Sequence, residues 1–307
     1  MPARNLAPVH ATLTRLSGTV GVWTLTHEAV HPASLGEVTT RIETAGFSAL
    51  WVPEAYGREA MTGALLLLER STGLVVASGI AQIHARDAMA TAAASRTLAD
   101  VSGGRFVLGL GVSHRPLVER ARGGAYPPPL RAMSAYLDGL ARAPVTSVEG
   151  EADVPVVVAA LGPRMLALAA ARADGALTYL VTPAHTAVAR AALGDGFLAV
   201  EQSVVLGQDR DEFLRRAHEH LNWYTGLENY RASWLRLGFD HDDFVRGGSE
   251  RLCDAIVAHG DAAAIAACVR AHVDAGADHV VLQVLGATTL EMPGDAWDEL
   301  GATLTEA

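Results

Sequence analysis

The sequence contains no lysine, so all 24 of its basic residues are arginine. Chemistry that needs a lysine amine is therefore excluded, including Schiff-base formation and the phosphate-binding lysine of a P-loop. Cysteine is also scarce, because Cys253 and Cys268 are the only two in 307 residues. Two cysteines cannot build a disulfide framework or a cysteine-rich zinc site.

Positive charge is scarce relative to negative charge, and the formal net charge at pH 7 is −10. This balance argues against a protein whose main partner is a nucleic acid. Long hydrophobic runs are missing too. The N-terminal segment 1–10 has no stretch of signal-peptide length, and the apolar run 64–68 is far too short to cross a membrane. We therefore expect a soluble, cytoplasmic protein without a membrane partner.

Apolar residues make up 50% of the chain and fall into alternating strand and helix patterns. Near-continuous apolar segments predict buried strands at 18–25, 47–53, 73–83, 106–112, 154–160, 176–180, 197–206 and 279–285. Helices are predicted at 34–45, 88–101, 116–141 with a break at 127–129, 163–172, 183–192, 210–237, 261–275 and 293–306. Because eight strand–helix units favour a closed barrel, we predict an α/β fold of the (β/α)8 TIM-barrel type. It would form a single domain over residues 1–307, with loop insertions at the C-terminal rim.

Active sites of such barrels form where the strands end. The candidate residues at these ends are Trp23, Thr24, Glu54, Tyr56, Gln82, His84, Ser113, His114, Gly162, Pro163, Arg164, Thr178, Tyr179, Gln202 and Gln283. His84 and His114 stand out, because two separate strand ends would bring both imidazoles to one rim. An imidazole near its usual pKa suits a role in proton transfer, which makes the position of His114 at this rim notable.

Residues 27–31, HEAVH, fit the H-E-x-x-H pattern of zinc proteases. That chemistry needs both histidines on one face of a helix, with the glutamate as base. Here Pro32 follows His31 directly, and a residue before proline avoids the helical region. We therefore interpret the segment as a loop at the barrel rim and predict no metal site.

Residues 109–114, GLGVSH, follow a predicted strand and partly match two known motifs. As a dinucleotide fingerprint the segment lacks the third glycine, because His114 stands there. As a nucleophile elbow it has Arg115 where the closing glycine belongs. What remains is a glycine-rich strand end, where the flat face of a ligand could approach the backbone.

Two further glycines each leave two interpretations open. Gly79, inside the third predicted strand, indicates either a bulge with close ligand approach or a tight packing point between strand and helix. Gly162, Pro163 and Arg164 stand where a strand turns into a helix. The free N–H groups of that helix and the arginine suit a phosphate, although an ordinary turn with a solvated arginine would have the same sequence.

Together these segments resemble the bacterial luciferase-like family, whose members are eightfold barrels that bind FMN or the deazaflavin coenzyme F420. The resemblance spans essentially the whole chain. It rests on the order and spacing of four blocks, 40–59, 77–114, 160–185 and 274–285. The GLGVSH form of residues 109–114 is similar to a subgroup described as F420-dependent oxidoreductases.

The resemblance implies a role for each block. Gly79 and Ile80 match a bulge, often with a non-proline cis peptide, that supports the deazaflavin ring from behind. The other residues implied to bind the cofactor are Glu54, Ala81, Gln82, Leu110, Gly111, Val112, Ser113 and Tyr179, with Gly162, Pro163, Arg164 and Met165 at its phosphate. For proton transfer we expect His114, with Glu54, His84 and Tyr56 as polar neighbours. Substrate positioning without proton transfer is the alternative role for each of them.

The chain also departs from the family pattern. Ala55 stands where some relatives have an active-site histidine, and Val112 where the sugar-phosphate dehydrogenases have a proton-donating glutamate. A lysine that holds a substrate phosphate in those relatives is absent, so oxidation of a sugar phosphate is disfavoured. We predict an F420-dependent oxidoreductase that acts on a small organic substrate as a homodimer, with a separate cofactor reductase as a candidate partner. The alternatives are an FMN-dependent monooxygenase that uses reduced flavin and oxygen, and a flavin-binding relative without catalysis.

Overall fold

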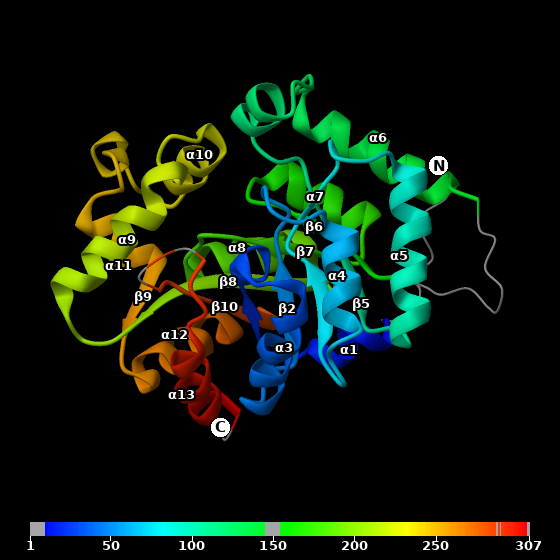
Figure 1. Ribbon diagram of the computed structural model, residues 1–307. Helices are drawn as coiled ribbons and strands as arrows, with labels where there is room; N and C mark the ends of the chain where they lie inside the picture. The colour runs from blue at the N-terminus through cyan, green and yellow to red at the C-terminus, as the bar shows by residue number, and fades with distance from the viewer. Residues whose placement is uncertain (1–9, 145–153, 287, 289, 306–307) are drawn as a thin grey trace.

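The computed structural model describes residues 10–144, 154–286, 288 and 290–305, and a closed parallel sheet lies at its centre (Figure 1). The strands are β1 (Thr19–Trp23), β2 (Ala49–Val52), β3 (Val75–Ser78), β4 (Ala81–Gln82), β5 (Phe106–Gly111), β6 (Val156–Ala159), β7 (Gly175–Thr178), β8 (Phe197–Leu206), β9 (Val257–Gly260) and β10 (His279–Val284). Strand β10 pairs with both β1 and β8, which closes the sheet. The closed ring consists of β1, β2, β3, β5, β6, β7, β8 and β10, while β4 pairs with β5 and β9 pairs with β8 outside it. The predicted eight-stranded (β/α)8 barrel is confirmed.

Helices surround the barrel and alternate with its strands, and all of those below except the helix at 60–68 match predicted helices. They are α3 (Leu35–Thr44), α4 (Ala60–Leu68), α5 (Ala88–Ser102), α6 (Pro129–Arg142), α7 (Pro163–Arg172), α8 (Pro183–Leu193), α12 (Ala262–Asp274) and α13 (Gly294–Thr305). Side-chain caps fix several starting points, since Asp87 and Asp261 each accept a backbone N–H three residues ahead, at 2.9 Å. Within the ranges that the structure describes, no helix is long and apolar enough to cross a membrane.

Alternating side chains divide the core into two layers. Along β2, Leu50 and Val52 belong to the layer between the sheet and the helices, whereas Ala49 and Trp51 fill the barrel interior. Helix α1 (Ala11–Leu16) adds Leu13 and Leu16 to the interior layer. Both faces of the sheet are therefore buried, which explains why the strands read as continuous apolar runs.

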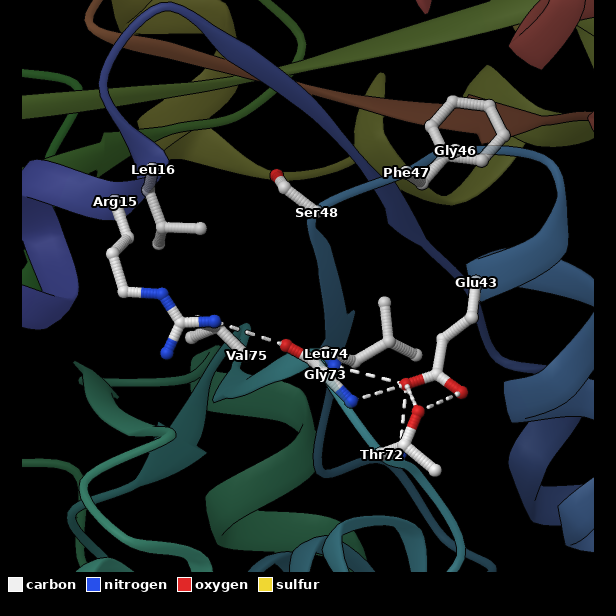
Figure 2. A pocket seen from close by; sticks show the side chains of 10 residues that line it. All are labelled: Arg15, Leu16, Glu43, Gly46, Phe47, Ser48, Thr72, Gly73, Leu74 and Val75. Carbon is white, nitrogen blue, oxygen red and sulfur yellow. Dashed lines mark hydrogen bonds between the residues drawn. The ribbon is translucent and has the colours of Figure 1, made fainter.

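The amino-terminal end of the barrel carries a cavity of about 300 Å³, shown in Figure 2. The Glu43 carboxylate accepts backbone N–H groups from Thr72, Gly73 and Leu74 at 2.8, 2.6 and 3.1 Å. Arg15 donates to the Gly73 carbonyl at 3.2 Å. These contacts tie α1 and α3 to the turn before β3.

Two predicted elements are interrupted in the structure. The strand predicted over 73–83 is divided into β3 and β4 by a cis peptide between Gly79 and Ile80, at the bulge that the family resemblance implies. The helix predicted over 210–237 is broken at Gly226 into α9 (Arg210–Tyr224) and α10 (Glu228–Arg236). With α11 (Glu250–Ile256), these helices form the insertion at the C-terminal rim and share their own apolar cluster around Trp234.

Candidate active site

A cavity of about 620 Å³ opens at the carboxyl ends of the strands. It lies where eightfold barrels place their active sites, and its size is within the range of about 300–1,000 Å³ found for small-molecule sites. The predicted site residues that line it are Glu54, Tyr56, Gly79, Ile80, Gln82, Gly111, Val112, Ser113, His114, Gly162, Met165 and Tyr179. These positions come from five different strand ends, so the barrel brings together residues that are far apart in sequence.

Five of the residues predicted to bind cofactor or move a proton do not line the cavity. Ala81 and Leu110 are partners in the β4–β5 pairing, and both pack in the layer between sheet and helices. Pro163 and Arg164 are exposed on the first turn of α7. His84 lies behind the wall, with its ring centroid 5.7 Å from that of the lining residue Tyr126.

Glu54 is held by hydrogen bonds on both oxygens. Its Oε2 accepts the Gln82 backbone N–H at 2.8 Å, and Arg86 forms an ion pair with Oε1. The Gln82 amide donates to the Glu54 carbonyl at 2.6 Å and accepts from Arg122 at 3.1 Å. Glu54 is only 6% exposed, so this network fixes a paired carboxylate beside the cavity. A paired carboxylate of this kind suits a positioning role.

Ile80 forms an apolar platform in the cavity, supported by close packing behind it. A Cβ on Gly111 would lie 2.5 Å from the Ile80 side chain, and a Cβ on Gly79 would lie 3.0 Å from Trp23 Nε1. Trp23 Nε1 also donates to the Gly79 carbonyl at 2.8 Å. The glycines are therefore needed for protein packing under the platform, and Ile80 itself is the surface that a ligand would meet.

The start of α7 forms the electropositive end of the cavity. Gly162 is the N-cap and Pro163 is the first helical residue, so the first free backbone N–H belongs to Arg164. The guanidinium that reaches this point belongs to Arg236 of α10, which donates to the Leu161 carbonyl at 3.2 Å and lines the cavity. A Cβ on Gly162 would meet only Arg236, at 3.7 Å, so the N-cap has open space beside it.

Aromatic side chains form a continuous wall on the side of α9 and α10. Tyr179 packs against Trp23 with ring centroids 5.4 Å apart, and Tyr224 packs against Tyr230 at 4.9 Å. Tyr230 in turn lies 5.8 Å from the His114 ring. Sequence reasoning missed Arg236, Tyr224 and Tyr230 as site residues. The available signal was the aromatic segment 223–230, WYTGLENY, inside an otherwise polar helix.

Burial changes the expected chemistry of His114. Burial lowers the pKa of its imidazole to about 4, so the expectation of an imidazole near its usual pKa is corrected. No hydrogen bond to its ring is present among the described residues, because the wall around it is apolar and aromatic. At neutral pH the side chain is therefore an uncharged donor and acceptor facing the cavity, which suits orientation of a substrate better than donation of a proton.

The H-E-x-x-H segment forms part of the rim. Helix α2 (Thr26–Ala29) is a single turn that ends before His31, whose backbone is extended. The Glu28 carboxylate accepts the N–H groups of Ala55 and Gly57, both at 3.1 Å, and so fixes the loop after β2. Across 10–144, 154–286, 288 and 290–305, no three His, Cys, Asp or Glu side chains form a group that could hold a metal.

The geometry agrees with the comparison of the whole sequence with known families. The sequence model of the luciferase-like monooxygenase family matches residues 14–279. The chain belongs to the luciferase-like monooxygenase family. One barrel fold can carry different activities, so membership fixes the fold more closely than the reaction.

Individual relatives are similar over part or all of the chain. A protein from Mycobacterium tuberculosis whose name describes a coenzyme F420-dependent oxidoreductase is 31% identical over 196 residues, which cover 54% of this chain and 56% of that protein. The chain spans about half the length of the curated relatives it matches.

Two solved structures share the fold over 94% of the chain. The coenzyme F420-dependent tetrahydromethanopterin reductase of Methanopyrus kandleri matches with a TM-score of 0.69 at 17% identity, over 98% of its own chain. The EDTA monooxygenase of Chelativorans sp. BNC1 matches with a TM-score of 0.71 at 12% identity, over 94% of its own chain. At these identities the likeness shows a common fold.

Proposed function

We propose that the protein is an F420-dependent oxidoreductase that transfers a hydride between the deazaflavin coenzyme and a small organic substrate. The observation that carries the proposal is one cavity lined by two different kinds of surface. The apolar Ile80 platform is one of them, and the α7 N-terminus with Arg236 is the other. A cofactor that combines a flat ring with a phosphate has the same two parts. The F420-dependent relatives support this choice of cofactor.

The residues at the phosphate end fit the group. An uncapped helix N-terminus attracts an anion through its free N–H groups and its dipole, and the planar guanidinium of Arg236 adds a charged donor pair. Gly162 leaves the approach open, because only Arg236 lies within 4 Å of the point that a Cβ would occupy. The prediction that Arg164 contributes its guanidinium is replaced by a proposed role for its backbone N–H.

The residues at the ring end fit as well. Ile80 would support the ring from behind, and the paired Glu54–Gln82–Arg86 network would hold the platform strand in place beside it. Trp23 would support the platform from behind through its hydrogen bond to the Gly79 carbonyl, and Tyr179, which packs against Trp23 and lines the cavity, would help to exclude water from the ring. When bound, the deazaflavin supplies a hydride donor and acceptor that reacts poorly with oxygen.

The substrate would lie between the platform and the wall of α9 and α10. There His114 presents a neutral imidazole, and Tyr56, which is 77% exposed, stands at the mouth. The only charged side chains that line this cavity within the described chain are Glu54 and Arg236, and both are engaged by protein partners. We also propose, as predicted, a homodimer and a separate reductase that recycles the cofactor.

A titration of the apo-protein with F420 and with FMN tests the proposal, with tryptophan fluorescence as the measure of binding. Trp23 and Trp223 line the cavity, so a bound ring should quench both. We expect F420 to bind at least tenfold more tightly than FMN, and a Trp223→Phe control to bind F420 equally with a smaller signal. Tighter binding of FMN would favour the monooxygenase alternative, and binding of neither would contradict both assignments.

A further inference from the structure

A second carboxyl group, Glu201 on β8, lies in the mouth of the barrel, and no cationic side chain among the described residues pairs with it. It is completely buried, and within the described chain no arginine or histidine forms an ion pair with it. Along β8 the side chains alternate, with Val200 and Val204 in the outer layer and Phe197 and Ala199 in the interior. Glu201 therefore points into the barrel, where an uncompensated carboxylate is costly.

Glu201 has two hydrogen-bond neighbours, and one of them, Ser203, connects it to helix α9. Ser203 Oγ lies 2.7 Å from Glu201 Oε1 and 3.1 Å from His220 Nε2. The Leu180 backbone N–H donates to Glu201 Oε2 at 3.1 Å. Because Oε2 already accepts that hydrogen bond, a proton on the carboxyl group belongs on Oε1, which faces Ser203.

The chain of contacts ends beside the cavity. The His220 ring centroid lies 5.4 Å from that of Tyr224 and 6.4 Å from that of Tyr179. Both tyrosines line the cavity, and their hydroxyl oxygens are 3.1 Å apart. Tyr179 also donates to Gln283 of β10 at 2.7 Å, which fixes its hydroxyl at the barrel mouth.

The surroundings of Glu201 contain neutral groups at neutral pH. The titratable groups that face it are His220 and Tyr224 of α9, Tyr179 at the end of β7 and Tyr230 of α10. Strand β10 presents Gln283, and His259 of β9 stacks on Phe213 instead. Burial raises the pKa of Glu201 to about 8, while the contacts with Ser203 and Leu180 oppose the shift. Burial also lowers the pKa of His220 to about 4.

We propose that Glu201 stores a proton for the reaction in the cavity and that Ser203 and His220 carry it toward the Tyr179–Tyr224 wall. This inference rests on the proposed oxidoreductase function, because it supplies the proton that accompanies hydride transfer to a substrate. It uses none of the residues that the sequence identifies for that role, since His114 and Glu54 lie on other strands.

In both end states of this relay, Ser203 makes one hydrogen bond to Glu201 Oε1 and one to His220 Nε2. In the first, Glu201 Oε1–H donates to Ser203, Ser203 donates to His220 Nε2, and His220 carries its proton on Nδ1. When Nδ1 gives up that proton to the substrate anion that hydride transfer leaves, Nε2 takes the Ser203 proton and Ser203 takes the Glu201 proton. In the second state, His220 Nε2–H donates to Ser203 and Ser203 donates to the Glu201 carboxylate. One proton has left, and the charge of the triad has changed from zero to −1.

A stability measurement tests, without any cofactor, whether Glu201 holds a proton in the folded protein. In the unfolded chain Glu201 releases its proton near pH 4.5, whereas in the folded protein it does so near pH 8. The folded state binds more protons between these values, so its stability relative to the unfolded state falls as pH rises from 4.5 to 8. Glu201→Gln keeps the shape and both hydrogen bonds but has no proton to lose. We expect the melting temperature of E201Q to rise relative to wild type across this interval.

Turnover tests whether the stored proton is used. With F420 as cofactor, we expect Glu201→Gln to lower kcat about 100-fold, the scale of general acid catalysis, while the affinity for F420 stays within about twofold. Wild-type kcat should fall as the pH rises through 8. In E201Q, kcat should not show this decrease with pH. Ser203→Ala and His220→Gln should slow turnover in the same way.

His272→Gln provides the matched control. His272 is another buried histidine whose pKa burial lowers to about 4, but it contacts Gln202 on the outer face of β8. The turnover of the His272→Gln variant should equal that of wild type. An E201Q turnover equal to wild type overturns the relay, and so does a melting-temperature difference that does not change with pH. A wild type that binds neither F420 nor FMN contradicts the proposed function itself, and the stability series then decides alone whether Glu201 holds a proton.

Discussion

The two ends of the barrel treat their polar side chains differently. At the amino-terminal end, Glu43 accepts three backbone N–H groups, and His279 uses both ring nitrogens, with the Thr19 carbonyl at 2.8 Å and Trp51 Nε1 at 3.3 Å. At the carboxyl-terminal end, Glu201 has no cationic partner, and His84 Nε2 is buried without any hydrogen-bond partner in the described chain.

This difference separates stability from function within one fold. Polar groups that are fully paired lower the free energy of the native state. Polar groups that are buried but only partly paired cost stability, and a ligand can offset that cost by binding. Changes at the amino-terminal end should therefore alter unfolding, and changes at the carboxyl-terminal end should alter binding or turnover.

The start of α7 is where we expect the largest effect. Gly162→Asp places a carboxylate at the N-cap beside Arg236, where its charge opposes a phosphate. We expect F420 affinity to fall at least 100-fold, about 2.7 kcal/mol. An aspartate at an N-cap is as good as or better than glycine, so the melting temperature should not fall. Gly162→Ala is the uncharged control, and equal affinities of the Asp and Ala variants for F420 would contradict the phosphate site.

Glu43 provides the corresponding test at the opposite end. Glu43→Ala leaves three backbone N–H groups without their carboxylate, and we expect a loss of about 2 kcal/mol in the free energy of unfolding by urea denaturation. The affinity of the folded variant for F420 should be unchanged. A variant with normal stability and weakened F420 binding would reverse the proposed division between the two ends.

The Glu43 contribution also has a pH dependence with a fixed sign. Burial alone would raise the pKa of Glu43, but its hydrogen bonds outweigh burial and the pKa lies below the usual 4.5. Its stabilisation is therefore present above pH 4.5 and is lost as the pH falls through the folded-state pKa. The stability difference between wild type and Glu43→Ala should shrink below pH 4.5.

Two arginines near α7 sharpen the comparison within the carboxyl-terminal end. Arg236 lines the cavity and Arg164 does not, although the sequence favours Arg164. We expect Arg236→Gln to weaken F420 binding about tenfold, the size of one charge-assisted hydrogen bond. Arg164→Gln should bind F420 like wild type, since only its backbone N–H is proposed to contribute. If Arg164→Gln weakened F420 binding and Arg236→Gln did not, the guanidinium of Arg164 would again be assigned to the phosphate.

The smallest effect is expected at His114. Its imidazole is neutral at neutral pH, because burial lowers the pKa to about 4. His114→Ala should remove one neutral hydrogen bond to the substrate and slow turnover about fivefold, with a smaller change in F420 affinity. Steady-state kinetics should show no kinetic pKa near 6.5 in wild type. A loss of 100-fold or more would return His114 to the role of proton donor.

The barrel and the site residues at the strand ends could be predicted, because both follow from the local pattern of apolar and polar residues along the sequence. Continuous apolar strands require a covered parallel sheet, and the sheet then brings Glu54, Gln82 and His114 to one rim. The prediction of a single domain over 1–307 and the roles of individual site residues stay predictions.

The remaining part of the site depends on packing that no local pattern specifies. Arg236 reaches α7 only because α10 is anchored over the barrel, where Trp234 Nε1 donates to the Leu180 carbonyl at 3.1 Å. Arg164 fails to line the cavity because the first turn of α7 leaves its side chain exposed. Glu201 did leave a signal, since it is the one charged residue in the apolar segment 197–206, at an inward-facing position.

A crystal structure of the protein with F420 would test the assignment of the cavity most directly. We predict that the deazaflavin ring lies against Ile80 and that the phosphate lies within hydrogen-bond distance of Arg236 and the Arg164 backbone N–H. A cofactor bound elsewhere, or a phosphate that contacts neither group, would contradict the assignment of this cavity as an F420 site.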